Sequence, residues 1–177
     1  DSYCLDNGDL HYGEELARDA LAAWRGPRDE VRILTKVGLT RPKGRWLPNS
    51  RPTHLRKAVQ GSLKALGVER LFLVQLHARD PGSPFEETLA ALAELQREGL
   101  IEHLGLCNVS SAEVRQAQRH FPVVVVQNEL SILQRDTAEA GLVAFTALAG
   151  IPFLAHRPLG GHAKVAKLEK NRVLAPL

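Results

Sequence analysis

The chain has 177 residues, 44% hydrophobic and 24% charged, a composition typical of one globular domain with its own core. Its net charge of +3 is small and scattered, which argues against nucleic-acid binding, and no apolar run reaches the roughly 18 residues of a membrane span. Two cysteines make no disulfide framework, so we expect a reducing, cytoplasmic compartment. Because the chain contains no methionine and begins at Asp1, we expect it to be cut at both ends.

Segments with helical periodicity alternate with short apolar segments along the chain. Helices are expected at 13–24, 50–66, 83–99, 110–121 and 136–150. Strands are expected at 31–37, 71–76, 100–106, 123–127 and 151–155. This alternation predicts β/α units and a parallel sheet, in a single domain that covers residues 1–177.

Capping residues mark the ends of the expected helices. The expected N-terminal caps are Gly13, Ser50, and the pairs Ser83–Glu86 and Ser110–Glu113, which have capping-box spacing. Each helix is followed or ended by a glycine or a proline: Gly26, Gly67, Gly99, Pro122 and Gly150. The first two helices carry apolar faces formed by Leu16, Ala20, Leu21 and Trp24, and by Leu55, Val59, Leu63 and Leu66.

A polar residue stands at the carboxyl end of every expected strand. These residues are Lys36, His77, Asn108, Gln127 and His156. Five strands suffice for a flavodoxin-like doubly wound sheet, whereas a (β/α)₈ barrel needs eight strands and about 250 residues. In a barrel the five polar residues would converge on one mouth, where the active sites of barrel enzymes lie.

Six strings of the sequence, in chain order, resemble segments of the aldo-keto reductases. They are DSY at 1–3, LTKV at 34–37, LFLVQLH at 71–77, GLCNVS at 105–110, VQNE at 126–129 and FLAHRPLGG at 153–161. The resemblance implies a parallel (β/α)₈ TIM barrel, incomplete in this chain, with about five of the eight strands present. The first two strands and the last would be missing. It therefore favours the barrel over the doubly wound sheet.

The same resemblance implies an enzyme that reduces a small aldehyde or ketone by hydride transfer from a nicotinamide cofactor, without a metal. Tyr3 would be the general acid, Lys36 its electrostatic partner, and His77 a donor that orients the substrate carbonyl. Tyrosine has a reference pKa of about 10 and needs such a cation to act as an acid at neutral pH. The family's aspartate, five residues before the tyrosine, lies outside this chain.

The resemblance also implies a set of cofactor-binding residues. Side-chain amides match the nicotinamide carboxamide because they offer both a donor and an acceptor. The implied residues are Cys107, Asn108, Gln127, His156, Arg157, Leu159 and Gly160. His156 would stack on the nicotinamide in place of an aromatic residue, and Arg157 would pair with the pyrophosphate. NADPH is the family expectation, and NADH is not excluded because the segment that recognises the 2′-phosphate is absent.

Two other functions stay open at this point: a cofactor-binding regulator similar to the potassium-channel β subunits, and an inactive remnant. Retention of the three implied catalytic residues favours the enzyme. We expect Arg41, Lys43 and Arg45 to be a solvated loop, with Trp46 flanking the substrate mouth. We expect the chain on its own to be inactive and prone to aggregation. Neither the substrate nor the oligomeric state follows from the sequence.

Overall fold

The computed structural model describes residues 3–4, 6, 8, 10–161 and 168. Its centre is a five-stranded sheet with the order β1-β4-β5-β6-β7, in which every neighbouring pair is parallel. The strands are β1 Leu34–Val37, β4 Leu71–Leu76, β5 Ile101–Cys107, β6 Val123–Glu129 and β7 Phe153–His156. A small antiparallel hairpin, β2 Leu39–Thr40 with β3 Leu47–Pro48, follows β1.

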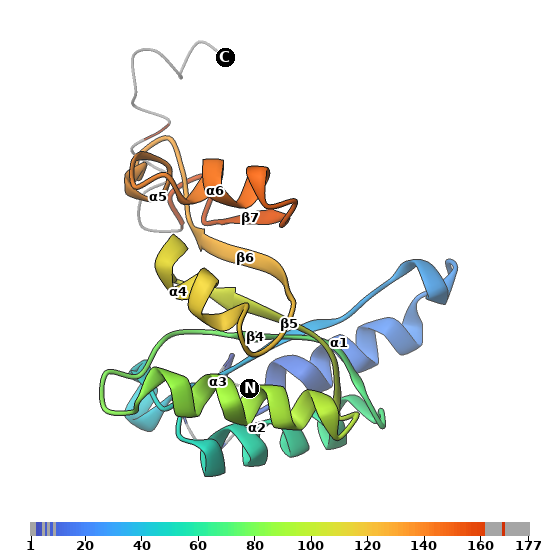
Figure 1. The fold of residues 1–177 in the computed structure, drawn as a ribbon. Coiled ribbons are helices and arrows are strands. Elements are labelled where there is room, and N and C mark those ends of the chain that lie inside the picture. The colour runs from blue at the N-terminus through green and yellow to red at the C-terminus, as the bar shows by residue number, and fades with distance from the viewer. Residues whose placement is uncertain (1–2, 5, 7, 9, 162–167, 169–177) are drawn as a thin grey trace.

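Helices connect the strands in a regular β/α succession. They are α1 Tyr12–Ala23, α2 Pro52–Leu66, α3 Phe85–Arg97, α4 Ser111–Ala117, α5 Asp136–Glu139 and α6 Leu142–Leu148. Helix α1 packs on α2 and α2 packs on α3, while α6 contacts both α4 and β7. Figure 1 shows the strands turning progressively from β4 to β7, with α2 and α3 lying below β4. The chain is thus a partial α/β barrel, as the sequence predicts.

The core forms between the strands and the helices that cover them. Helices α2 and α3 contribute fully buried leucines and a valine, and β4 and β5 contribute fully buried residues on the facing side of the sheet. These residues are Leu55, Val59, Leu89, Leu92, Val74, Leu76, Leu104 and Leu106. The predicted apolar face of α2 is therefore confirmed, because burial of such a stripe against a sheet is what stabilises a helix of this length.

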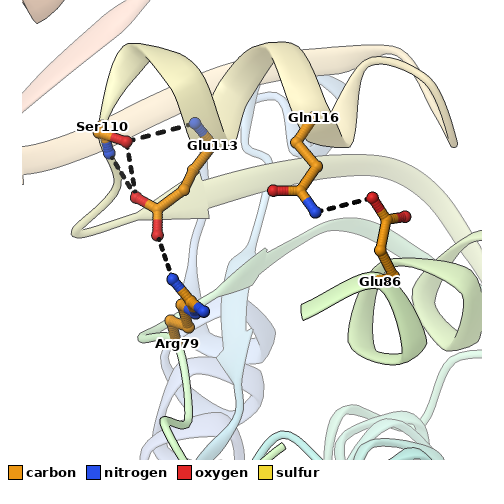
Figure 2. Close-up of polar contacts among 5 residues, drawn as sticks. All are labelled: Arg79, Glu86, Ser110, Glu113 and Gln116. Carbon is orange, nitrogen blue, oxygen red and sulfur yellow. Dashed lines mark hydrogen bonds and ion pairs between the residues drawn. The ribbon is translucent and has the colours of Figure 1, made fainter. Parts of the chain in front are cut away.

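Several local predictions are confirmed. Strand β4 has the predicted bounds, and Gly67 ends α2 in the left-handed conformation, with φ 68°. Ser110 and Glu113 form the predicted capping box at the start of α4. Figure 2 shows Arg79 reaching the same Glu113 carboxylate, with 3.2 Å between Nη1 and Oε1.

Helix α4 is also tied to α3 by polar contacts at its other end. Gln116 donates to Glu86 at 2.7 Å (Figure 2), and Arg119 donates to the same carboxylate oxygen at 3.0 Å. These contacts keep α4 close to α3, and therefore keep the loop after β5, which carries Asn108, in a fixed place beside the end of β4.

The other three predicted N-terminal caps are wrong. His11, not Gly13, is the N-cap of α1. Ser50 is buried and hydrogen-bonds Thr88 of α3 at 3.0 Å, and Ser83 donates to the Asp80 carboxylate at 3.1 Å. Serine hydroxyls have several alternative partners of similar strength. Here Thr88 of another helix bonds the Ser50 hydroxyl, and the nearby Asp80 accepts from the Ser83 hydroxyl, so neither serine caps its helix.

The predicted apolar face of α1 is also wrong. Leu16 and Trp24 are 57% and 53% exposed, whereas Glu14 is only 4% exposed. The Glu14 carboxylate accepts hydrogen bonds from the hydroxyls of Thr35 at 2.7 Å and Ser62 at 2.9 Å. Helix α1 therefore meets the rest of the structure through a buried polar contact.

Several predicted elements are shorter than expected: the helix expected at 110–121 ends at Ala117, and the one expected at 83–99 runs from Phe85 to Arg97. Strand β1 begins at Leu34, because a short 3₁₀ turn at Arg28–Glu30 precedes it. The helix expected at 136–150 is divided into α5 and α6 by Gly141, which has φ 77° and is the N-cap of α6. In the part of the chain that the structure describes, no helix is long and apolar enough to cross a membrane.

The sheet has an open edge at each side within the described residues, because β1 pairs only with β4 and β7 only with β6. Leu34 and Leu154, in these two edge strands, are 42% and 38% exposed. Unpaired edges and exposed apolar residues favour aggregation. A polypeptide limited to residues 1–177 should therefore be poorly soluble, without a cooperative thermal transition. Size-exclusion chromatography and calorimetry test this, and a soluble monomer with a sharp melt would contradict it.

Candidate active site

The carboxyl ends of the strands surround one hollow, as predicted for a barrel mouth. The side chains that line it are Tyr3, Lys36, His77, Cys107, Asn108, Gln127 and His156. Residues from all five strands or the positions just after them contribute, together with Tyr3 from the segment before α1. The structure thus brings together seven of the ten residues that the sequence singled out.

The remaining three predicted residues lie in the turn after β7 and do not line the hollow. Arg157 has φ 51°, and the amide of Gly160 donates to its carbonyl oxygen at 2.7 Å, which closes a tight turn. Leu159 is 60% exposed. Of the segment at 1–3 that resembles the tyrosine motif, only Tyr3 belongs to the described residues; Asp1 and Ser2 lie outside them.

Tyr3 and Lys36 are in direct contact. The Lys36 ammonium donates to the Tyr3 phenolic oxygen at 3.1 Å, and the same nitrogen lies 5.1 Å from the centre of the ring. An ammonium at this distance stabilises negative charge that develops on the phenolic oxygen when the hydroxyl gives up its proton. The contact therefore places a cation against the phenolic oxygen at the edge of the hollow.

His77 lies beside this pair, immediately after β4. Its ring centre is 5.6 Å from that of Tyr3, and its backbone amide donates to the carbonyl of Val37 at 2.8 Å. Burial, followed by the positive charge of Lys36, lowers the pKa of His77 to about 4. The ring is therefore neutral at pH 7, with one N–H to donate and one nitrogen to accept. Its Nδ1 is buried, and no described residue bonds to it.

The two predicted amide side chains are held in place by neighbours and keep one polar atom each for a ligand. Asn108, which has φ 56°, donates through Nδ2 to the carbonyl of His77 at 2.8 Å. The Cys107 thiol donates to Gln127 Oε1 at a sulfur–oxygen distance of 3.7 Å. No described residue bonds to Asn108 Oδ1 or Gln127 Nε2. An acceptor and a donor therefore remain, which is what the carboxamide of a nicotinamide requires.

Cys107 and His156 are both uncharged at neutral pH. Burial raises the pKa of the Cys107 thiol to about 12, so this cysteine serves as a weak hydrogen-bond donor and not as a nucleophile. Burial, with the positive charge of Arg157 adding to it and that of Glu129 opposing, lowers the pKa of His156. A neutral His156 can lie against a positively charged ring without electrostatic repulsion.

The hairpin after β1 supplies an aromatic wall that the sequence placed at the substrate mouth. Trp46 lies 5.9 Å from Tyr3 and 5.8 Å from His77, at steep interplanar angles of 71° and 62°. Arg41 is half-buried and stacks 3.9 Å from the Trp46 ring, so the expectation that it is merely solvated is wrong. Lys43 is exposed, as expected.

One residue beneath the site was not singled out from the sequence. Gln75 is only 1% exposed and precedes His77 by two positions, so both side chains point to the same side of β4. Gly105 makes room for it, because a Cβ atom there would lie 3.2 Å from Gln75 Cγ and 2.5 Å from Val125 Cγ1. The signal in the sequence is a glutamine that interrupts the apolar run LFLVQLH.

The model of the Aldo/keto reductase family matches residues 2–174, nearly the whole chain. The chain belongs to the aldo/keto reductase family. Pyridoxine 4-dehydrogenase of Escherichia coli is 35% identical over 185 aligned residues, which cover 98% of this chain and 62% of that protein. An uncharacterized oxidoreductase of Schizosaccharomyces pombe is 34% identical over 160 residues, covering 90% of this chain and 51% of that one. The chain thus spans between about half and two thirds of these relatives.

Solved structures of aldo/keto reductases share the fold. A glycerol dehydrogenase from Gluconobacter oxydans superimposes with a TM-score of 0.73 and 27% identity, over 82% of this chain and 45% of that chain. A thermostable aldo-keto reductase gives 0.71 and 29%, over 89% and 56% of the two chains. The partial barrel therefore corresponds to about half of each of these longer aldo/keto reductases.

The neutral state of His77 has a consequence for stability. Its pKa is about 4 in the folded state and 6.5 ordinarily, so the unfolded chain binds more protons between these values. The resulting stability is present above about pH 6.5 and is lost as the pH falls towards 4. In the full-length protein, this effect should lower the free energy of unfolding by about 2 kcal/mol between pH 6.5 and pH 4, after a reduction for partial solvent screening. His77→Gln should remove this part of the pH dependence.

Urea unfolding of both proteins between pH 4 and pH 7 measures this difference, and the NMR titration of the His77 ring protons measures its pKa directly. An ordinary ring titration near pH 6.5, or the same pH dependence in His77→Gln, would show that burial does not hold His77 neutral.

Proposed function

We propose that the full-length protein is a nicotinamide-dependent oxidoreductase that reduces aldehydes or ketones to alcohols. The observation that carries the proposal is the 3.1 Å contact between Lys36 Nζ and the Tyr3 hydroxyl, with the neutral ring of His77 beside it. Carbonyl reduction needs a proton donor, a group that stabilises the donor's charge and a group that orients the carbonyl oxygen. The hollow holds one residue suited to each role.

In the proposed reaction, the hydride for the carbonyl carbon would come from a reduced nicotinamide held by the residues named in the next paragraph. Tyr3 gives its hydroxyl proton to the carbonyl oxygen, and Lys36 stabilises the phenolate that remains. His77 donates a hydrogen bond to the same carbonyl oxygen and fixes its direction. The reverse sequence oxidises an alcohol, because the same groups serve both directions, with the Tyr3 phenolate accepting the proton.

The cofactor in this proposal is held by residues around the other half of the hollow. Asn108 Oδ1 and Gln127 Nε2 would hold the carboxamide, and His156 would offer its ring face to the nicotinamide. The tight turn at 157–160 lies next to His156 and offers the Arg157 guanidinium to the pyrophosphate. We propose NADPH on the basis of family membership.

The substrate in this proposal is a small carbonyl compound, with a planar aromatic aldehyde as the first candidate. The relative named pyridoxine 4-dehydrogenase aligns with 98% of this chain and suggests an aromatic alcohol–aldehyde pair. Trp46 offers a flat apolar surface within 6 Å of both Tyr3 and His77. An aromatic ring lying against it would place its aldehyde near the proton donor.

The role of Tyr3 is tested by Tyr3→Phe in the full-length protein, which removes the hydroxyl and keeps the ring. The kcat for benzaldehyde reduction should fall by at least about 10²-fold, the scale of lost general-acid catalysis. The chain has one other tyrosine, Tyr12, which is 54% exposed on α1, so Tyr12→Phe is a matched control that should keep full activity. A higher KM with unchanged kcat would remove Tyr3 from the acid role.

The role of His156 is tested by cofactor binding. His156→Tyr should tighten the oxidised cofactor by roughly 0.5–1.5 kcal/mol, the range for an aromatic pair. The gain should be largest near pH 5, where part of the histidine population is charged and repels the positive ring, and smaller near pH 8. Fluorescence titration at both pH values measures it, with His156→Ala as the variant that loses the stacking surface. Equal or weaker binding by His156→Tyr at both values would show that His156 is not the platform.

A further inference from the structure

A second cavity, of about 690 Å³, lies on the flank of the partial barrel and shares no residue with the hollow. It is formed by the start of α1, the β2 strand and one face of α2. The residues that line it are Leu10, His11, Thr40, His54, Lys57, Ala58, Gln60, Gly61 and Lys64. Its size falls within the range of small-molecule sites, about 300–1,000 Å³.

The cavity wall is basic and contains no carboxylate. His54, Lys57 and Lys64 recur on α2 at spacings of three and seven residues, which places them along one helical face. Both lysines are exposed, and no acidic side chain among the described residues forms an ion pair with either. Two positive charges therefore face the same cavity without compensation from the part of the chain that is described.

Small residues form the floor of the cavity, and one histidine is fixed above it. A Cβ atom on Gly61 would overlap the His11 ring, so glycine is needed for the ring to lie there. The His11 Nδ1 atom is 3.4 Å from the Ser62 hydroxyl and 3.6 Å from the Glu14 carboxylate. That carboxylate is buried on the far side and does not line the cavity. His11 thus closes one end with its position set by two partners.

His54 presents an unsatisfied polar atom in the same wall. The ring bonds the backbone of Leu39, and its Nε2 atom is buried with no partner among the described residues. A buried polar atom without a partner costs free energy, and a ligand that reaches it recovers that cost. Burial lowers the pKa of His54, and the ring donates to the Leu39 backbone, so the ring is neutral and Nε2 is an acceptor. A ligand must therefore bring a hydrogen-bond donor to this atom, while the positive charge in the wall, which favours an anionic group, comes from Lys57 and Lys64.

We propose that this cavity binds the phosphate group of a small organic phosphate monoester. Lys57 and Lys64 would contact the dianion, Leu10 and Ala58 would contact the carbon portion, and a hydroxyl of the ligand or a water molecule would donate to His54 Nε2. Two uncompensated lysines match a dianion better than a single carboxylate, and the volume exceeds what inorganic phosphate alone occupies. This site is independent of the proposed carbonyl chemistry, since it uses none of the residues that line the hollow.

The test uses the full-length protein with its cofactor site saturated by NADPH, and phenyl phosphate as the probe. Isothermal titration calorimetry should show saturable binding of phenyl phosphate, weaker binding of inorganic phosphate, and none of phenol at matched ionic strength. The double variant Lys57→Glu/Lys64→Glu should weaken phenyl phosphate at least about tenfold. Arg25→Glu/Lys43→Glu changes the net charge equally at two exposed positions away from the cavity and should leave the affinity unchanged.

Three outcomes would overturn the proposal. The first is the absence of saturable binding. The second is an equal loss of phenyl phosphate affinity in both double variants, which would show that the affinity depends on net charge and not on the cavity. The third is binding that appears only without NADPH, which would assign it to the cofactor site. A further experiment measures whether the protein sediments with vesicles that contain phosphatidic acid. Sedimentation that is lost in Lys57→Glu/Lys64→Glu would show that the cavity binds a lipid headgroup and not a soluble phosphate monoester. Circular dichroism of each variant confirms that it is folded.

Discussion

Register in a parallel sheet determines where the polar side chains of this molecule can lie. Lys36 pairs with Gln75, and Gln75 pairs with Gly105, so these three positions point to the same side of the sheet. Two residues further on, His77 and Cys107 point to that side again, and Cys107 pairs with Gln127. A shift of one residue in any strand would move its polar residue to the side of the sheet that the helices cover, away from the other residues of the site. The site depends on this register more than on any single contact.

Among the side chains on this side of the sheet, the positive charge of Lys36 affects the protonation of its neighbours. Lys36 donates to Tyr3, and its charge adds to burial in lowering the pKa of His77 to about 4. Cys107 remains a thiol because burial outweighs the opposing effect of the same lysine. A second cation in the layer would repel the first at low dielectric, and a thiolate would compete with Tyr3 for the ammonium. Neutral His77 and neutral Cys107 therefore add neither a second positive charge nor a negative charge beside the contact between Lys36 and the phenolic oxygen.

The sequence predicts the features that depend on repetition along the chain, and misses those that depend on a distant partner. The bounds of β4 and the convergence of Lys36, His77 and Gln127 follow from periodicity and from the ends of parallel strands. The Ser110–Glu113 capping box is local and is also found. The Ser50 hydroxyl is bonded instead by Thr88, which lies 38 residues further along the chain and cannot be indicated by sequence spacing. Ser83 and Glu86 have the same local spacing, yet the Ser83 hydroxyl donates to Asp80, three residues before it, so a competing local partner also defeats the prediction.

Helix α1 is another case in which contacts between distant residues differ from what the sequence pattern predicts. Leu16 and Trp24 suggest an apolar contact surface, but the helix is joined to its neighbours through Glu14. Burial alone would raise the pKa of Glu14, but this pKa lies well below its usual range, and hydrogen bonds with His11 and Thr35 are among the causes that lower it. Charge-assisted hydrogen bonds offset part of the cost of burying this carboxylate and fix the direction of its partners.

The partner that matters most for the site is Thr35, which immediately precedes Lys36. Successive side chains in a strand point to opposite sides, so the bond from Thr35 to Glu14 holds β1 from the helix side while Lys36 reaches the hollow from the other. Ser62 adds a bond from α2 to the same carboxylate. The buried Glu14 thus ties α1, α2 and β1 together at the residue next to the proposed electrostatic partner of Tyr3. The position of the Lys36 ammonium is set by this contact as much as by the contacts inside the hollow.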